Sequence, residues 1–277
     1  MKETKRYISA AVGLVLLAAV IYLVDTIVLN VILAFIGIVA VYESVKACCK
    51  AAVLWYIVPC SLFVVTYIFF SPDIVMTTVL LIFILFCISM GSGGRYTYKE
   101  MSKVFLLTVL IAFGLSSVIA LRDFGSTVSD KRVLVIFGFG YGWLGDSLAY
   151  TFGKAFGKRK MSPRISPGKT IFGAVSAITI TTIASALLFF LYASKCAPDS
   201  LFYNRNTLGY CVAAAAAGLV GSIIGVLGDL ALSFVKRDSG IKDFGKIMPG
   251  HGGAIDRIDN ILFTSVYACF VFSLLLR

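Results

Sequence analysis

Nine apolar runs, each about long enough to cross a lipid bilayer as a helix, dominate this 277-residue sequence. A membrane-spanning helix needs roughly 17–25 consecutive, mostly apolar residues. Short segments with charged residues, glycine or proline separate the runs. The sequence therefore predicts an all-α, polytopic integral membrane protein with about nine transmembrane helices, at approximately 8–24, 27–42, 51–70, 74–90, 104–121, 133–152, 171–193, 212–235 and 260–276.

The composition agrees with a protein that has much of its surface in contact with lipid. Hydrophobic residues make up 59% of the chain and charged residues only 14%, whereas soluble domains have about 45–50% and about 25%. The basic residues before the run at 8–24 are typical of a secretory signal, but no small-residue cleavage site follows. We therefore expect a retained first helix.

The distribution of basic residues predicts the orientation in the membrane. With the N-terminus in the cytoplasm, 19 of the 25 Lys and Arg residues lie in the cytoplasmic tail and loops. Cytoplasmic loops carry an excess of Lys and Arg, so the chain is predicted N-in and C-out, in the cytoplasmic (inner) membrane. The net charge of +11 is then explained by loops and anionic lipid headgroups, and we expect membrane lipids but no nucleic acid as partners.

Charge is also uneven along the chain. The first five runs carry no charge at mid-span, while the sixth and eighth each hold an aspartate, Asp146 and Asp229. We therefore expect scaffold helices over 1–132 and a catalytic membrane region over 133–277, with cytoplasmic loops at 153–170 and 236–259. A carboxylate inside a membrane span costs roughly 2.5–3.5 kcal/mol on insertion scales, which favours function over chance, although a structural ion pair is the alternative.

Two further aspartates, Asp256 and Asp259, are spaced three apart at the start of the ninth run. That spacing places both on one face of a helix. Simple capping of the helix N-terminus is the alternative for this pair alone. Together with Asp146 and Asp229 they would offer oxygen ligands at one depth, which favours Mg²⁺ and a bound polyphosphate.

The two cytoplasmic loops are rich in basic residues and glycine. The segment 250–253 reads Gly-His-Gly-Gly and contains His251, the single histidine. Glycine lets the backbone approach a ligand closely, and flanking Lys and Arg hold phosphate oxygens. The earlier loop ends in Ser166-Pro-Gly-Lys169-Thr170 before the seventh run, where phosphate contact at a helix N-terminus is expected.

These motifs resemble the phosphatidate cytidylyltransferases (CDP-diacylglycerol synthases). The segment from Ser233 through Asp259 matches that family's signature over 27 residues, and Gly145-Asp146 with the Ser166–Thr170 motif resembles its other cytoplasmic motifs. The resemblance covers about 142–260. The family usually has acidic residues where this chain has Phe172 and Leu232.

The resemblance implies transfer of CMP from CTP to phosphatidic acid, giving CDP-diacylglycerol and pyrophosphate with Mg²⁺. The resemblance does not decide whether a second cation binds or whether the protein forms a homodimer. It also does not decide the acyl-chain preference or the choice between CTP and dCTP. His251 and Arg257 are expected to act on the nucleotide phosphates. The expected catalytic residues are Asp229, Lys242, His251, Asp256 and Arg257, and the expected metal ligands are Asp146, Asp229, Asp256 and Asp259.

Substrate binding is expected from the remaining polar residues of the two loops. Lys158, Arg159 and Lys160 are expected to attract the anionic lipid surface. The other expected substrate-binding residues are Ser166, Lys169, Thr170, Lys236, Arg237, Gly252 and Gly253. Two alternatives remain: a cation-coupled transporter that uses the intramembrane aspartates, and a phosphoryl- or glycosyl-lipid transferase of another family.

Overall fold

The computed structural model describes residues 18, 20–49, 54–93, 96–203, 206–245 and 252–276. Its helices are α2 (Ile27–Cys48), α3 (Leu54–Phe70), α4 (Ile74–Gly91), α5 (Tyr98–Phe124), α6 (Val128–Phe156), α7 (Ile171–Ala193), α8 (Thr207–Asp238) and α9 (Ile255–Leu275). In the described part of the chain, all of these except the 17-residue α3 are long and apolar enough to span a membrane. The prediction of an all-α polytopic membrane protein is confirmed.

The helices match eight of the nine predicted runs, but several extend further than predicted. The helix α2 continues to Cys48 instead of ending at 42, α6 begins at Val128 and ends at Phe156, and α8 continues to Asp238. These predicted ends were wrong because hydropathy marks where a helix leaves its apolar surroundings, whereas backbone hydrogen bonding continues into polar residues. The predicted run at 8–24 lies mostly outside the described residues.

The chain divides into two compact units, and the division passes through α5, α8 and α9. The first unit comprises Met1–Ser116 and Val235–Ile258, and the second comprises Ser117–Phe234 and Asp259–Arg277. The segment 235–258 therefore groups with the N-terminal helices, although the sequence placed it in the catalytic region. One reason is the ion pair of Lys103 on α5 with Asp238, whose Nζ and Oδ2 atoms are 2.8 Å apart.

In the first unit, α2 packs closely against α3 at a glycine. A Cβ atom added to Gly37 would lie 2.6 Å from Val64 Cγ1, so the lack of a side chain permits this approach. By contrast, α4 buries only Leu81 and Leu85 within the described structure. Its other side chains are available to lipid, as its apolar sequence requires.

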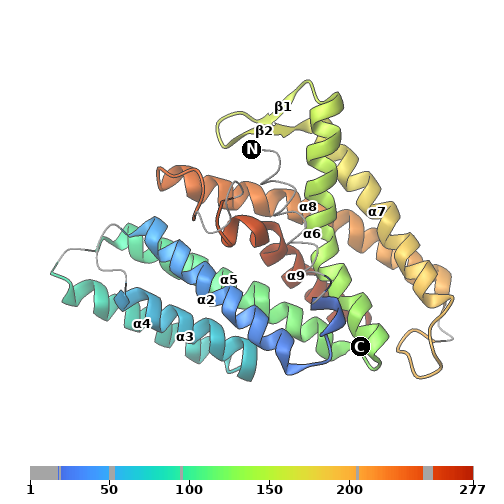
Figure 1. Ribbon diagram of the computed structural model, residues 1–277, viewed down its shortest axis with the longest axis horizontal. Coiled ribbons are helices and arrows are strands. Elements are labelled where there is room, and N and C mark those ends of the chain that lie inside the picture. Colours follow the sequence, from blue (N-terminus) through green and yellow to red (C-terminus); the bar gives the residue numbers. More distant parts are fainter. Residues whose placement is uncertain are drawn as a thin grey trace. The chain divides into compact units, whose positions relative to one another are not determined.

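In the second unit, α6 and α7 lie side by side, and a two-stranded hairpin joins their ends (Figure 1). Thr127 and Asp130 form a capping box at the start of α6. The Asp130 carboxylate is fully buried and also accepts hydrogen bonds from Ser200 Oγ at 2.6 Å and the backbone N–H of Leu201 at 3.2 Å. This aspartate therefore ties the start of α6 to the loop between α7 and α8.

Glycines of α8 let neighbouring helices approach in the same unit. A Cβ atom on Gly221 would lie 2.6 Å from the Tyr141 ring of α6, and one on Gly225 would lie 3.6 Å from the Gly142 Cα atom. These two glycines thus permit close packing of α6 against α8. Gly228 of the same helix faces Phe263 of α9 instead. A helix that contacts several neighbours can present glycines on more than one face.

Candidate active site

The hairpin after α6 forms one wall of the candidate site. Its strands β1 (Lys160–Ser162) and β2 (Ser166–Thr170) are antiparallel, with Lys160 opposite Thr170 and Ser162 opposite Ser166. The sequence predicted only a loop here. Thr170 ends β2 and caps α7, where its hydroxyl accepts a hydrogen bond from the Gly173 N–H at 3.2 Å. The predicted position of this motif at a helix N-terminus is confirmed.

Close contact between α6 and α7 fixes the base of the hairpin. A Cβ atom on Gly153 of α6 would lie 2.8 Å from Thr170 Oγ1, and one on Gly173 of α7 would lie 2.9 Å from the Gly153 Cα atom. Larger residues at either glycine would push the two helices apart. The hairpin is therefore held in place by packing that only small residues allow.

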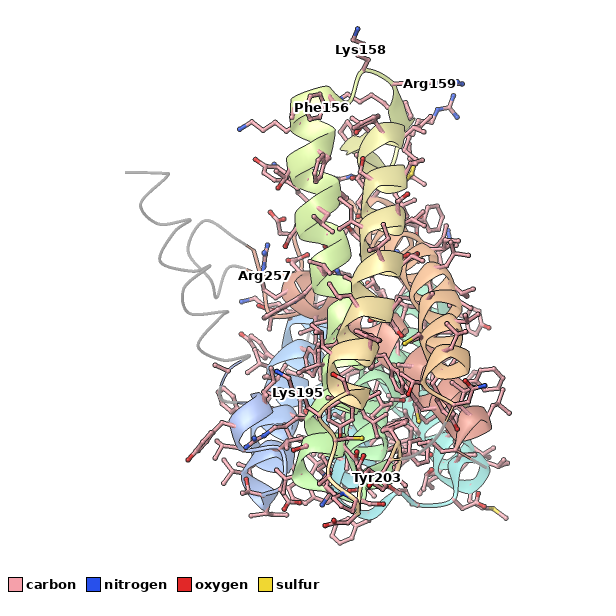
Figure 2. The ribbon with its side chains drawn as sticks, turned by 90° about the vertical axis from the view of Figure 1, so that its right-hand side faces the viewer. Phe156, Lys158, Arg159, Lys195, Tyr203 and Arg257 are labelled. Atoms are coloured by element: carbon pink, nitrogen blue, oxygen red, sulfur yellow. The ribbon has the colours of Figure 1, made fainter. Side chains whose placement is uncertain are left out.

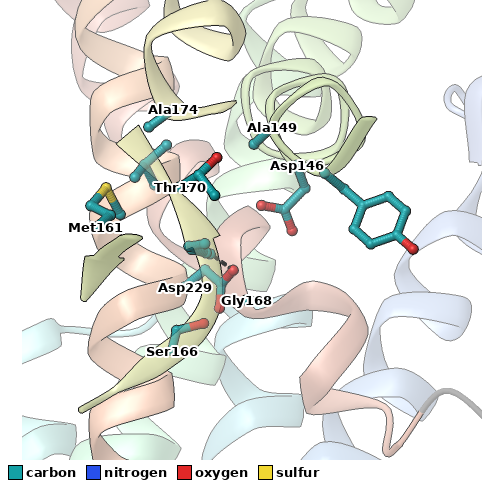
Figure 3. Close-up of a pocket in the computed structure, with 11 residues that line it drawn as sticks. Asp146, Ala149, Met161, Ser166, Gly168, Thr170, Ala174 and Asp229 are labelled. Carbon is teal, nitrogen blue, oxygen red and sulfur yellow. Dashed lines mark ion pairs between the residues drawn. The ribbon is translucent and has the colours of Figure 1, made fainter. Parts of the chain in front are cut away.

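A cavity of about 290 Å³ lies beside the hairpin (Figure 3). Figure 3 shows Asp146 on α6 and Asp229 on α8, with β2 crossing beside them. Its lining residues are Asp146, Ala149, Tyr150, Met161, Ser166, Gly168, Lys169, Thr170, Ala174, Val226 and Asp229. The cavity thus brings together five of the residues that the sequence singled out, from three separate segments of the chain.

Lys169 and Asp229 form an ion pair in this cavity. The two side chains are only 19% and 15% exposed, so solvent screens their attraction much less than at a surface. The other carboxylate oxygen of Asp229 accepts a hydrogen bond from Ser233 Oγ at 3.2 Å. The lysine that the sequence assigned to phosphate binding is therefore held next to a carboxylate in this structure.

The basic residues at the turn after α6 lie apart from the cavity. Lys158, Arg159 and Lys160 are exposed and none of them lines it. Figure 2 shows Lys158 and Arg159 beyond the ends of α6 and α7, at the opposite end of these helices from Lys195 and Tyr203. This position suits contact with a surface rather than with a buried group.

A second polar cluster lies in the first unit, around Asp256 at the start of α9. Its Oδ1 atom is 3.0 Å from Lys236 Nζ, and both side chains are at least nine-tenths buried. Its Oδ2 atom accepts hydrogen bonds from the backbone N–H groups of Phe244 at 3.0 Å and Gly253 at 2.9 Å. Gly252 has φ of +84°, a conformation that glycine adopts without strain.

The other predicted residues of this segment have separate surroundings. Arg237 is exposed and donates a hydrogen bond to the Ile241 carbonyl at 3.1 Å, while Arg257 is exposed at the start of α9. Lys242 lines a cavity of about 680 Å³ together with Glu43 and Lys46 of α2. His251, together with Lys246 and Gly250, lies outside the described residues.

Glu43 is a buried acidic residue that the sequence analysis did not single out. It is 2% exposed, and its Oε2 atom accepts a hydrogen bond from the backbone N–H of Ile255 at 3.2 Å. The sequence placed it in a polar segment after the second run. The signal available was an acidic residue directly after an apolar run, which is where an extended helix carries it into the protein.

The four predicted metal ligands are distributed over the two compact units. Asp256 belongs to the first unit, whereas Asp146, Asp229 and Asp259 belong to the second. Asp259 is 6% exposed and accepts a hydrogen bond from the Asn260 N–H at 2.9 Å. Among the described residues, no three His, Cys, Asp or Glu side chains are grouped to hold a metal ion. Magnesium binding stays a prediction.

Comparison with known proteins finds one family model and several relatives that are similar to this chain. A model described as the cytidylyltransferase family matches residues 4–275. Phosphatidate cytidylyltransferase of Haemophilus influenzae is 34% identical over 182 residues, which cover 64% of this chain and 60% of that protein. Phosphatidate cytidylyltransferase of Staphylococcus haemolyticus is 32% identical over 181 residues, covering 65% and 62%.

A third relative is the Escherichia coli protein named uncharacterized protein YnbB. It is 36% identical over 175 residues, which cover 63% of this chain and 53% of that protein. In each of these alignments the chain spans less than two thirds of the relative's length.

Proposed function

The chain belongs to the cytidylyltransferase family, and on this basis we propose that it transfers CMP from CTP to phosphatidic acid. A phosphate oxygen of the lipid attacks the α-phosphorus of CTP, the bond to the bridging oxygen breaks, and pyrophosphate leaves. The products are CDP-diacylglycerol and pyrophosphate. The observation that carries this proposal is the cavity in which Asp146, Lys169 and Asp229 meet.

This reaction needs little proton transfer from the protein. The second pKa of a phosphate monoester is about 6, so the lipid phosphate is an anion near neutral pH. Catalysis of phosphoryl transfer then depends on positioning the reactants and neutralising charge. Lys169 supplies positive charge in the cavity, and the Thr170 hydroxyl, which accepts from Gly173, also has a proton to donate to a phosphate oxygen.

Magnesium fits the donor set of this cavity. Mg²⁺ is usually held by one or two carboxylates, with substrate phosphates and water as its other ligands. Asp146 and Asp229 both line the cavity, which supports them as the residues that would hold the ion. When bound, the ion would neutralise charge that develops on the nucleotide phosphates. Asp256 and Asp259 remain proposed contributors.

We further propose that the site faces the cytoplasm from the inner membrane, in an N-in, C-out arrangement. The proposal rests on the 19 of 25 basic residues that this orientation gives to the cytoplasmic side. CTP would then reach the site from the cytoplasm while the acyl chains of phosphatidic acid stay in lipid. The mass of the purified protein in detergent would test the proposed homodimer.

A direct assay tests the proposed reaction. The purified full chain is incubated in detergent with labelled CTP, phosphatidic acid and Mg²⁺, and labelled lipid is measured, with EDTA and UTP as comparison conditions. The asparagine variants of Asp229, Asp256 and Asp259 should each lose more than about tenfold in rate. Absence of labelled lipid from the folded wild-type protein, or full activity in EDTA, would contradict the corresponding proposal.

The same preparation tests the alternative transporter function. A cation-coupled transporter would move an ion or solute across sealed vesicles without consuming CTP. No contact in the described structure specifically favours that function. Transport that depends on Asp146 and Asp229, without any formation of labelled lipid, would replace the proposed activity.

A further inference from the structure

Two carboxylates from distant parts of the sequence hold both ends of the segment between Phe244 and Ile255. Asp256 accepts hydrogen bonds from the N–H groups of Phe244 and Gly253. Glu43, more than 200 residues earlier in the chain, accepts from the N–H of Ile255 at 3.2 Å. We call this arrangement the carboxylate clasp: Glu43 and Asp256 with the backbone of Phe244, Gly245, Gly253 and Ile255.

The two glycines of the clasp are explained by Glu43. A Cβ atom at Gly245 or at Gly253 would overlap the Glu43 carboxylate. Any other residue at these positions would therefore displace either the carboxylate or the backbone. The backbone before and after the intervening segment thus approaches the same carboxyl group, and this approach depends on the absence of side chains.

Burial makes this position costly for a carboxylate. Glu43 is 2% exposed, and among the described residues its Oε1 atom has no hydrogen-bond partner. A buried polar atom without a partner costs about 1–3 kcal/mol. Stability alone does not favour such a group at this place in an apolar helix, so a functional reason is indicated.

The clasp adjoins groups that the proposed reaction needs. Lys242 and Glu43 line the same cavity of about 680 Å³, and Asp256 is paired with Lys236. The clasp therefore determines where the ends of this segment lie relative to Lys236 and Lys242. A displacement of about 1 Å far from the reacting atoms can cost on the order of 100-fold in rate.

We propose that Glu43 is a positioning residue of the transferase, which fixes the backbone of the clasp without contacting the substrates. The inference rests on the proposed function and extends the machinery to α2, in the region that the sequence assigned to a scaffold. Alanine at position 43 removes a buried carboxyl group, one of whose oxygens has no partner among the described residues, and alanine favours the helix. The Glu43→Ala variant should therefore fold, with an unchanged or higher melting temperature, and be a poorer enzyme.

The experiment compares Glu43→Ala and Glu43→Gln with wild-type protein in detergent. Glutamine retains an oxygen that can accept from Ile255, so Glu43→Gln should keep its turnover within about threefold, whereas Glu43→Ala should lose roughly 10- to 100-fold. Hydrogen exchange measured by mass spectrometry should rise in peptides covering 241–256 of Glu43→Ala and stay unchanged at 160–170. Glu100→Ala is the matched control, because Glu100 caps α5 through Thr97 and lines neither cavity.

The outcomes separate this inference from the proposed activity. Wild-type turnover and wild-type exchange in Glu43→Ala would overturn the inference. So would an equal loss of melting temperature and turnover in both Glu43 variants, because that pattern indicates a general structural role. If the wild-type protein makes no labelled lipid, the proposed function fails, while the exchange measurement still tests the clasp.

Discussion

The Lys169–Asp229 pair can be tested by replacing each partner alone and then both together. We expect stability and activity to respond differently to the double replacement. The variants are Lys169→Met, Asp229→Asn and the double substitution, each chosen to keep the side-chain volume similar while removing a charge. Either single change leaves one charge without its partner inside the cavity. The double change removes both charges, so it should restore stability but not activity.

The magnitude follows from the burial of the pair. Two unit charges about 4 Å apart attract by about 4 kcal/mol at an effective dielectric constant of about 20, and the side chains are 19% and 15% exposed. Desolvation offsets part of this attraction. Each single variant should lose about 3 kcal/mol, and the double variant should lose less than the sum by at least about 2 kcal/mol, a factor of about 30.

Unfolding in mixed detergent micelles with increasing SDS measures these free energies, and the labelled-lipid assay measures activity. The Lys103–Asp238 pair is the control, because its aspartate side chain is 57% exposed and it lines neither cavity. Its coupling should be smaller. Additive losses for Lys169 and Asp229 within about 0.5 kcal/mol would refute the ion pair, and an active double variant would refute its role in the cavity.

Three further predictions test other parts of the molecule. Cysteine at position 158 should react with an impermeant reagent only in opened cells and cysteine at 195 in intact cells, with exposed native cysteines replaced; the reverse would contradict the N-in orientation. Asp130→Ala should cost about 3 kcal/mol in unfolding free energy, because it leaves several donors unsatisfied, while turnover stays unchanged; a stable but inactive variant would contradict this. Neutralising 158–160 should weaken binding to anionic vesicles, and the difference should shrink as salt is raised; a difference that persists at high salt would point to direct contacts instead.

The helices were predictable because the length and hydropathy of a membrane span are local properties of the sequence. The hairpin was not predictable in the same way, since β2 reads Ser-Pro-Gly-Lys-Thr, without alternating apolar residues. At the base of the hairpin, Gly153 approaches Gly173, and these two residues lie on different helices. Such contacts are set by tertiary packing, which overrides local propensity.

Site residues were predictable as residue types, but their partners were not. The two aspartates that the sequence places inside apolar runs, Asp146 and Asp229, line one cavity. Nothing in the spacing indicated that Lys169 pairs with Asp229, and Glu43 was missed because its helix continues beyond the apolar run. Leu232, where the resembling family has an acidic residue, is 2% exposed, so this chain uses the position for packing.

Basic residues of this chain lie in two kinds of surroundings: some are buried and paired, and others are exposed. Lys169 and Lys236 are mostly buried, and each is paired with an aspartate. A paired lysine and aspartate add no net charge, which lowers the cost of carrying both groups toward an apolar environment. Lys158, Arg159 and Lys160 are exposed instead and contribute to the net charge of +11. The buried pairs can therefore be tested through stability and turnover, whereas the exposed cluster acts at longer range and can be tested through salt.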